Sequence, residues 1–281
     1  MKINIITEST ADITKEQAKE MGITILPIPI RFGEDEYLAG ETLDNQLFYK
    51  ILMESDEFPK TSQITPFVYE QAIAERRAKN EDVLIITISK KLSGCYQNAI
   101  KAAYKYADHV KVIDSESASL GQRILVEYAF SLIKEGLSLD DIVIALEKVK
   151  ERIHVLALVD TLDYLVKGGR LSKVAAIAGQ ILSIKPIISV QNGKVEVVGK
   201  ARGTKAGFNS LKKLIKQRGE IDDTLPMAFG YSGLSDAKVR QYLSCNEDLY
   251  LSIKEIRIMQ MGSAIGAYTG PNVVGLAWFT K

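Results

Sequence analysis

The chain has only two cysteines, Cys95 and Cys245, and only two histidines, His109 and His154. Two cysteines do not make a disulfide framework, and no cysteine or histidine set has the spacing of a zinc site, so we expect no bound metal. A Ser-His-Asp arrangement needs a histidine placed as the base. We expect His109 at the surface and His154 at a helix end, so neither is well placed for that role.

Long apolar runs and an excess of charge of one sign are also missing. The longest uncharged apolar stretch is far below the roughly 18–20 residues that cross a bilayer, and the opening MKINIITEST predicts a short strand and not a signal peptide. The formal net charge is +1, with 25% charged residues. We therefore expect a cytoplasmic protein that has no integral membrane segment and does not bind nucleic acid.

Phosphate-binding glycine motifs are absent as well. The sequence contains no G-x-x-x-x-G-K-[ST], and no G-x-G-x-x-G follows a predicted strand. Gly266 and Gly270 lack the lysine that a phosphate loop requires. A mononucleotide or dinucleotide cofactor is therefore not expected.

The first half of the chain repeats one unit, in which an apolar strand runs into a polar loop and then a helix. The predicted strands are Ile3–Thr7, Val83–Ile88 and Val110–Ile113. Helices are predicted over Tyr96–Ala107 and Leu120–Lys134. Alternating strands and helices indicate a parallel sheet that is covered by helices on both sides.

The second half has a different pattern. A buried type of strand, Val155–Val159, is followed by an alanine-rich stretch that predicts a helix over Val174–Leu182. Asn192-Gly193 then predicts a tight hairpin turn, and hence antiparallel strands. We place a boundary near residue 155, which gives an N-terminal α/β domain over 1–155 and a C-terminal α/β domain over 156–281.

Hydroxyl side chains follow the predicted strands, where ligands of open α/β sheets bind. Ser93-Gly94 can direct a hydroxyl and free N–H groups at one point, and a helix start favours an anion there. Ser93 is a candidate nucleophile, an anion-binding residue or only the cap of its helix. Thr61-Ser62 stands just before the Thr65-Pro66 helix start. It is either part of the same anion cradle or only a turn that precedes the helix.

Three further side chains have two interpretations each. Cys95, at the helix start, is either a thiol with a lowered pKa or a small core residue. Arg170, which follows two glycines, and Arg202 have two interpretations. They either bind an anion, since guanidinium matches carboxylate and phosphate geometry, or are solvated surface residues.

Together these segments resemble the DegV family along essentially the whole chain. The ordered motifs that carry the resemblance are Thr7-Glu-Ser-Thr-Ala-Asp12, Lys60-Thr-Ser-Gln63, Leu92-Ser-Gly-Cys-Tyr-Gln97, Asp114-Ser-Glu-Ser-Ala-Ser119, Leu165-Val-Lys-Gly-Gly-Arg170, Lys185-Pro186, Lys200-Ala-Arg202 and Ile265-Gly-Ala-Tyr-Thr-Gly-Pro271. Where the family commonly has histidine in the last motif, this chain has Tyr268. A phenol still donates a hydrogen bond but stays neutral at pH 7.

The resemblance implies a two-domain α/β fold, with a parallel α/β/α domain followed by a domain with a mixed or antiparallel sheet. It also implies a non-catalytic carrier of one long-chain fatty acid, such as palmitate or stearate, which presents the carboxylate to a separate fatty acid kinase. Thr61 and Ser93 match the family's carboxylate cradle, with Ser62, Gly94 and Tyr268 beside them. Arg170 and Arg202 are expected at the entrance or towards the partner, and Arg202 corresponds to the family's entrance arginine.

Two other classes of function remain open from the sequence. One is an enzyme that handles acyl groups or phosphoesters through Ser93 with Arg170 or Arg202. The other is a protein-interaction domain with an empty cleft. A carrier should copurify with a molecule of fatty-acid mass, whereas an enzyme should turn over an ester, thioester or phosphoester.

Overall fold

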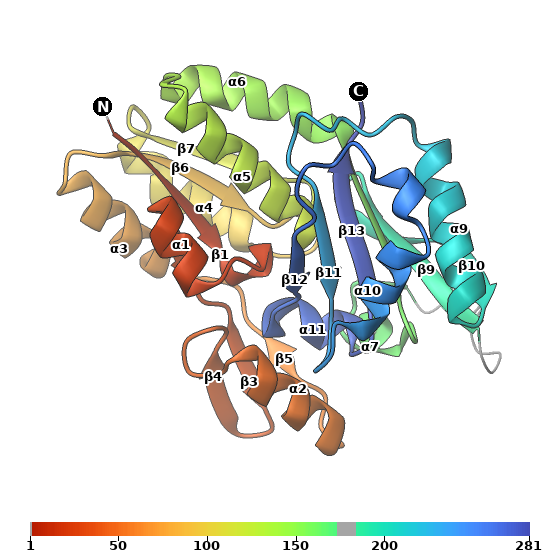
Figure 1. Cartoon of the computed structure of the whole chain (residues 1–281). Coiled ribbons are helices and arrows are strands. Elements are labelled where there is room, and N and C mark those ends of the chain that lie inside the picture. The colour runs from red at the N-terminus through yellow and green to blue at the C-terminus, as the bar shows by residue number, and fades with distance from the viewer. Residues whose placement is uncertain (1, 173–183) are drawn as a thin grey trace.

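The computed structural model describes residues 2–172 and 184–281. Within these residues the chain forms three sheets, of four, six and three strands. Figure 1 shows the two larger sheets side by side, with the smallest below them. The predicted fold class, a parallel α/β domain followed by one with a mixed sheet, is confirmed. The helix expected over Val174–Leu182 lies outside the described residues.

The first sheet is parallel throughout, with the order β2-β1-β6-β7. Its strands are β1 (Ile3–Glu8), β2 (Thr24–Leu26), β6 (Asp82–Thr87) and β7 (Val110–Asp114). The two central strands, β1 and β6, are almost continuously buried, as expected when helices cover both faces. The helices of this part are α1 (Lys15–Met21), α3 (Pro66–Arg77), α4 (Cys95–Ala103), α5 (Leu120–Lys134) and α6 (Leu139–Val149), with short 3-10 turns at η1 (Ser9–Ala11), η2 (Tyr104–Tyr106) and η3 (Lys150–Arg152).

The helix starts follow from local side-chain chemistry. Thr14 and Gln17 form a reciprocal capping box at α1. The Thr65 hydroxyl accepts from the Val68 N–H at α3, where Pro66 takes the first helical position, as predicted. Helix α5 spans the residues that the sequence predicts, and it is buried on nearly every face because it packs against strands of both large sheets.

A small antiparallel sheet, which the sequence analysis did not predict, interrupts the first half. It consists of β3 (Pro29–Phe32), β4 (Asp35–Leu38) and β5 (Lys60–Thr61), with helix α2 (Asn45–Glu54) between β4 and β5. Strands of two to four residues contain too few side chains to show an alternation. Strand β5 matters most, because it ends at Thr61.

The second sheet is mixed and has the order β10-β9-β8-β13-β11-β12. Only the β11–β12 pair is parallel, and the hairpin of β9 and β10 turns at Asn192-Gly193 as predicted. The strands are β8 (Ile153–Leu158), β9 (Ile184–Gln191), β10 (Lys194–Arg202), β11 (Ala228–Tyr231), β12 (Ile258–Gln260) and β13 (Val274–Phe279). Around them lie α7 (Asp163–Lys167), α9 (Thr204–Gln217), α10 (Ala237–Ser244), α11 (Ser263–Thr269) and the 3-10 turn η5 (Glu247–Leu249).

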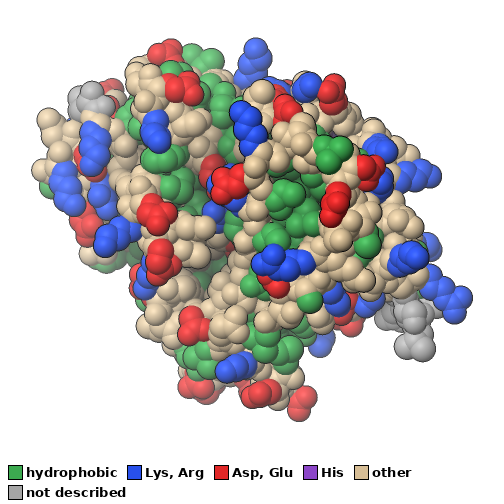
Figure 2. Space-filling view, viewed as in Figure 1, with side chains coloured by type: hydrophobic (Ala, Val, Ile, Leu, Met, Phe, Trp, Pro, Cys, Tyr) green, Lys and Arg blue, Asp and Glu red, His purple; other side chains and the backbone are tan. Residues whose placement is uncertain are grey.

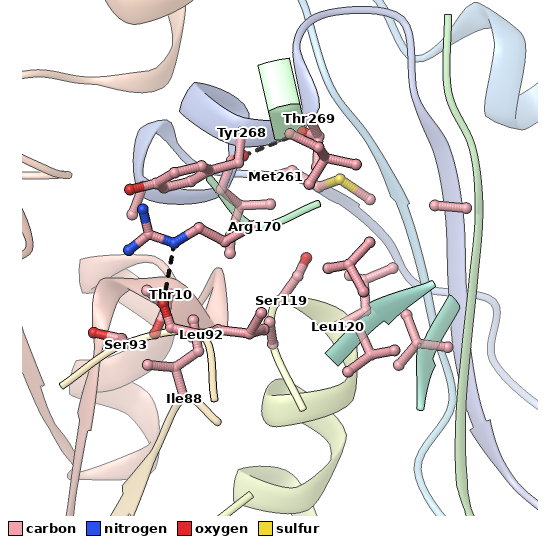
Figure 3. Close-up of a pocket in the computed structure, with 18 of the residues that line it drawn as sticks. Thr10, Ile88, Leu92, Ser93, Ser119, Leu120, Arg170, Met261, Tyr268 and Thr269 are labelled. Carbon is pink, nitrogen blue, oxygen red and sulfur yellow. Dashed lines mark hydrogen bonds between the residues drawn. The ribbon is translucent and has the colours of Figure 1, made fainter. Parts of the chain in front are cut away.

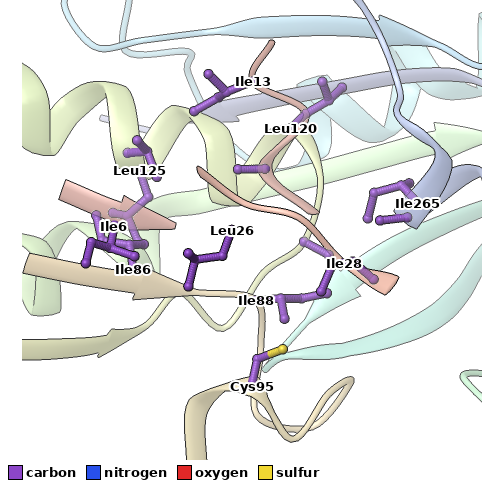
Figure 4. Close-up of a cluster of buried hydrophobic side chains, with 14 of the residues drawn as sticks. Ile6, Ile13, Leu26, Ile28, Ile86, Ile88, Cys95, Leu120, Leu125 and Ile265 are labelled. Carbon is purple, nitrogen blue, oxygen red and sulfur yellow. The ribbon is translucent and has the colours of Figure 1, made fainter. Parts of the chain in front are cut away.

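One hydrophobic cluster joins the two larger sheets, and a second lies behind the C-terminal sheet. Figure 4 shows Ile28, Ile88, Leu120 and Ile265, from four separate segments, within the first cluster. Strand β8 already belongs to the second sheet and begins at Ile153. A division into 1–155 and 156–281 is our proposal for the domain boundary.

The visible surface mixes charges of both signs. On the face in Figure 2, acidic and basic side chains are interspersed among polar and apolar ones. No helix in residues 2–172 or 184–281 combines the length and apolarity needed to cross a bilayer.

Candidate functional site

A cavity of about 430 Å³ lies where the carboxyl ends of the first sheet face the second sheet. Its walls come from the loops after β1 and β6, the start of α5, strands β8, β9, β10 and β13, and helix α11. This volume is within the range of small-molecule pockets. The parallel sheet therefore presents its hydroxyl-bearing loops to a ligand-sized space, at the edge where such folds bind ligands.

One end of the cavity gathers the five residues that were expected to bind a carboxylate. Thr61, Ser62, Ser93, Gly94 and Tyr268 all line it. They come from the end of β5, the start of α4 and helix α11, so three distant segments meet here. The hydroxyls of Thr61 and Tyr268 lie 2.5 Å apart and share a hydrogen bond. Tyr268 thus occupies the cavity wall, with its phenol directed at the expected cradle (Figure 3).

Ser93 does not occupy the cap position of its helix. The residue at that position is Gly94, and α4 begins at Cys95, so the interpretation of Ser93 as the N-cap is wrong by one residue. The Ser93 hydroxyl accepts a hydrogen bond from the Cys95 N–H at 3.3 Å and lies 3.2 Å from the Cys95 sulfur. Ser93 is half-buried and lines the cavity.

Gln63 is a cavity residue that the sequence analysis did not select. A side chain at Gly94 would place its Cβ only 1.7 Å from the Gln63 Oε1, so the amide lies directly against the glycine. Gly94 leaves room for this close approach, and a Cβ at this position would displace the Gln63 side chain. The signal was present in the sequence, since Gln63 is the last residue of the Lys60-Thr-Ser-Gln63 motif.

Arg170 supplies positive charge to the cavity. Its Nε donates to the Leu92 carbonyl at 3.1 Å and its Nη1 to the Gly168 carbonyl at 2.6 Å. The guanidinium carbon lies 4.5 Å from the centre of the Tyr268 ring, a cation–π contact. Among the described residues that line the cavity, Arg170 alone is charged, and the groups to which it donates are neutral backbone carbonyls.

Arg202 lies elsewhere. It is exposed at the end of β10 opposite the Asn192-Gly193 turn, and it is not among the residues that line the cavity. The turn itself contacts the N-terminal part, because the Ser89 hydroxyl donates to the Gly193 carbonyl at 2.8 Å. The structure therefore brings Arg170 to the cavity but not Arg202.

Neither histidine lies near Ser93. His109 faces Asp82 at the opposite edge of the first sheet, with the Nδ1–Oδ1 distance at 2.9 Å. The prediction that His154 satisfies a helix end is wrong: it is a residue of strand β8, where burial and the charge of Arg218 lower its pKa to about 4. Burial raises the pKa of the Cys95 thiol to about 11. Cys95 is therefore a buried thiol, and its alternative reading as an activated thiolate is wrong.

Two buried carboxyl groups stand behind the cavity wall, and sequence analysis did not select them. Glu8, at the end of β1, accepts from the Ile88 N–H at 3.0 Å and from the Gln122 amide at 2.8 Å. Asp12 accepts from the Ser119 hydroxyl at 2.5 Å and from the Gly262 N–H at 2.7 Å. Burial raises the pKa of both, that of Asp12 to about 7.

The remainder of the cavity is largely apolar. Its lining includes Ile28, Ile88, Leu120, Leu165, Val195, Met261, Ile265 and Val273. Gly275 of β13 pairs with Gly230 of β11, and the Met261 methyl and Leu120 side chains occupy the space that two Cβ atoms would fill. The cavity thus combines one polar, cationic end with an apolar interior.

Comparisons with a family model and with known proteins agree on one family. A family model described as "Uncharacterised protein, DegV family" matches residues 2–281. A DegV domain-containing protein of Caldanaerobacter subterraneus subsp. tengcongensis is 32% identical over 284 residues, covering 100% of this chain and 99% of that protein.

Solved structures agree in fold over the full length. A DegV family protein from Thermus thermophilus, described by its fatty acid binding, has a TM-score of 0.89 at 30% identity, with 100% of both chains covered. DegV from Bacillus subtilis, described as a fatty acid binding protein, has a TM-score of 0.83 at 30% identity, again over 100% of both chains. A stearic acid-binding protein from Eubacterium ventriosum is 25% identical, with a TM-score of 0.86 over 99% of this chain and 98% of that one.

Proposed function

Since the chain belongs to the DegV family, we propose that it binds one long-chain fatty acid non-covalently. The tail lies in the apolar part of the cavity, and the carboxylate is held by Thr61 and Ser93, with Ser62, Gly94 and Tyr268 beside them. The observation that carries the proposal is a largely apolar cavity with hydroxyls and one cation, Arg170, gathered at one end. Solved relatives that are described as fatty-acid-binding support it.

Tail and head group contribute differently. A saturated C16 tail has about 14 CH₂ groups, and at about 0.8 kcal/mol each their burial supplies roughly 11 kcal/mol before the costs of association. A hydrogen bond to the charged carboxylate contributes about 1.5–3 kcal/mol. The tail therefore sets most of the affinity, and the polar end fixes the position of the carboxylate.

Ser93 acts as a hydrogen-bond donor in this proposal and does not become acylated. Neither histidine lines the cavity, and the neighbouring Cys95 thiol is protonated at neutral pH. Presentation of the carboxylate to a separate fatty acid kinase rests on the family resemblance, with exposed Arg202 as a partner-facing residue.

Mass spectrometry tests the proposal directly. Protein incubated with palmitate should gain one ligand mass under native conditions and return to the polypeptide mass after denaturation. A mass increase that survives denaturation and maps to Ser93 would support a serine-dependent acyl-handling enzyme instead. A protein that gains no palmitate mass at any ligand concentration would favour a protein-interaction domain over a fatty-acid carrier.

A paired substitution separates the role of Ser93 from a local folding effect. Ser93→Ala should weaken binding of laurate, a soluble C12 fatty acid, by about tenfold, the equivalent of one charge-assisted hydrogen bond. Ser235→Ala is the matched control, because the exposed Ser235 accepts the same kind of turn hydrogen bond, from the Ala237 N–H, away from the cavity. Equal effects of the two substitutions would contradict a carboxylate-binding role for Ser93.

A further inference from the structure

We propose that buried Glu8 directs the Ser93 hydroxyl towards the ligand through Tyr69 and Cys95, and that Glu8 does this as a neutral acid. The cradle then binds the carboxylate together with a proton that is held on Glu8. This inference rests on the proposed function of the cavity, and it assigns a positioning role to three residues that do not touch the ligand.

The four side chains form a continuous polar path. The Tyr69 hydroxyl contacts a carboxylate oxygen of Glu8, and it also faces the Cys95 thiol. The Cys95 sulfur lies 3.2 Å from the Ser93 hydroxyl. Glu8, Tyr69 and Cys95 are fully buried, whereas Ser93 lines the cavity. The path therefore leads from a buried acid to the expected carboxylate position.

The surroundings of Glu8 contain no counter-charge. Its second oxygen accepts from the Ile88 N–H, the Gln122 amide and, at 3.3 Å, the Thr10 hydroxyl. The titratable groups that face it are Tyr69 from α3 and Cys95 from α4, and both are neutral at pH 7. In the described part of the chain no lysine, arginine or histidine bonds to Glu8. Burial without a cation favours the protonated carboxyl group.

The protonation state of Glu8 decides the direction of every hydrogen bond along the path. Tyr69 is placed to donate to Glu8, and Ser93 is placed to donate to Cys95. Protonation of Glu8 reverses both directions. Its O–H then donates to Tyr69, Tyr69 donates to the Cys95 sulfur, and the thiol donates to the Ser93 oxygen. The Ser93 proton is then free to point into the cavity. With Glu8 ionised, Tyr69 donates to Glu8, Cys95 donates to Tyr69, and Ser93 donates to Cys95. Ser93 then presents a lone pair to the ligand.

A carboxylate distinguishes these two arrangements and an alcohol does not. An ionised carboxylate only accepts hydrogen bonds, so it requires the Ser93 hydroxyl to donate. A fatty alcohol both donates and accepts, so it binds either arrangement. Laurate and dodecanol have the same tail length. The ratio of their affinities therefore reports the direction of the hydrogen bonds between Glu8 and Ser93, and it cancels changes in tail packing.

Binding of laurate and dodecanol by the full chain, measured between pH 6 and 9.5, tests the proposal. Glu8→Gln retains the donor pattern of the neutral acid, with its NH₂ towards Tyr69 and its oxygen towards Ile88 and Gln122. We expect its laurate-to-dodecanol ratio to stay within about twofold of the wild type at neutral pH and to be independent of pH. Tyr69→Phe breaks the path, so the ligand must first displace the Ser93–Cys95 contact. We expect this variant to weaken laurate relative to dodecanol by about threefold to tenfold.

Tyr242→Phe is the matched control, because Tyr242 is also fully buried and its hydroxyl bonds to Tyr250, alone among the described residues, behind the C-terminal sheet. The wild-type ratio should be constant or fall as the pH rises, since any titration of Glu8 removes the required proton. A ratio that rises with pH, a selective loss of laurate binding in Glu8→Gln, or equal ratios in Tyr69→Phe and Tyr242→Phe would each overturn the inference. Failure of the wild type to bind either ligand would instead reject the proposed function.

Discussion

At the scale of single residues, the stacked pair of Arg170 and Tyr268 defines the polar end of the cavity. The phenol shares a hydrogen bond with Thr61, and the guanidinium lies over the ring. Because a phenol is neutral at pH 7, Tyr268 adds a hydrogen bond but no charge. The one full positive charge on the described part of the cavity wall is therefore that of Arg170.

Removal of this charge should weaken anion binding. We expect Arg170→Gln to lower laurate affinity by at least about tenfold, since hydrogen bonds to a charged group contribute about 1.5–3 kcal/mol. The variant should also lose most of the salt dependence of binding, because screening acts on the charge pair. Arg202→Gln, on an exposed arginine off the cavity, is the control and should bind laurate as the wild type does. Fluorescence titration at two salt concentrations measures both effects.

The sequence identified the cavity's polar residues better than the groups behind them. Thr61, Ser93 and Arg170 stand in short motifs next to glycine or at predicted strand and helix ends, so local chemistry pointed to them. Glu8 and Asp12 also follow a predicted strand, Ile3–Thr7, but an acidic residue after a strand is usually solvated. The packing of α3, α5 and α11 around the end of β1 buries these carboxyls, and no local pattern contains that information.

At the scale of elements, the paired glycines of β11 and β13 leave room for the Met261 and Leu120 side chains of the cavity wall. A Cβ at Gly275 would lie 2.4 Å from the Met261 methyl and 3.4 Å from Leu120. Gly275, Met261 and Leu120 all line the cavity, so an added methyl group at Gly275 displaces the Met261 side chain and takes up space in the cavity wall.

Gly275→Ala should therefore shorten the fatty acid that the cavity accepts. We expect stearate to lose affinity relative to laurate, because two or more CH₂ groups that no longer fit correspond to a loss of about 1.6 kcal/mol or more, roughly tenfold. Gly199→Ala is the matched control, since a Cβ there meets its nearest atom, Ile187 Cδ1, at an ordinary 3.5 Å. An unchanged ratio of stearate to laurate affinity in Gly275→Ala would mean that the tail ends elsewhere.

Asp12 connects the loop after β1 to the starts of α5 and α11. Its pKa is raised from 3.8 to about 7, chiefly by burial, although the Ser119 and Gly262 donors and the charge of Arg123 lower it. A carboxyl whose pKa is raised on folding stabilises the native state fully below pH 3.8. That contribution is lost progressively as the pH rises to about 7.

Substitution of Asp12 by Asn should remove this pH dependence. Since each pKa unit corresponds to about 1.4 kcal/mol, the free energy of unfolding of the wild type should fall by up to about 4 kcal/mol, relative to Asp12→Asn, between pH 4 and pH 8. Urea unfolding of both proteins at the two pH values measures the difference, and the comparison cancels other titrating groups. A constant difference between the proteins would show that Asp12 keeps its ordinary pKa.

The elements themselves were predictable where the chain carries strong local signals. Helix α5 is long and has a glycine stop at Gly136, and Asn192-Gly193 fixes a hairpin, so both were predicted correctly. The three-strand sheet that delivers Thr61 was not, because its strands are short and pair with segments far along the chain. His154 was misplaced for a related reason, since a strand that starts directly after a helix leaves no turn signal between them.

At the scale of the whole molecule, the cavity belongs to neither large sheet alone. Its wall combines Ser93 and Leu120 from the first part of the chain with Ile188 and Met261 from the second. The main hydrophobic cluster also joins both parts. A ligand that fills the cavity therefore contacts both halves, and it should stabilise them together.

The single tryptophan makes this coupling measurable. Trp278 is fully buried in β13, within the cluster behind the C-terminal sheet, so its fluorescence follows unfolding of the second half. Far-ultraviolet circular dichroism follows the helices, many of which lie in the first half. With laurate at 100 times its Kd, both signals should shift to higher denaturant by the same amount, equivalent to about 2.7 kcal/mol. A shift of the Trp278 transition alone would mean that the ligand contacts only the C-terminal part, in which case Thr61 and Ser93 would not hold its carboxylate.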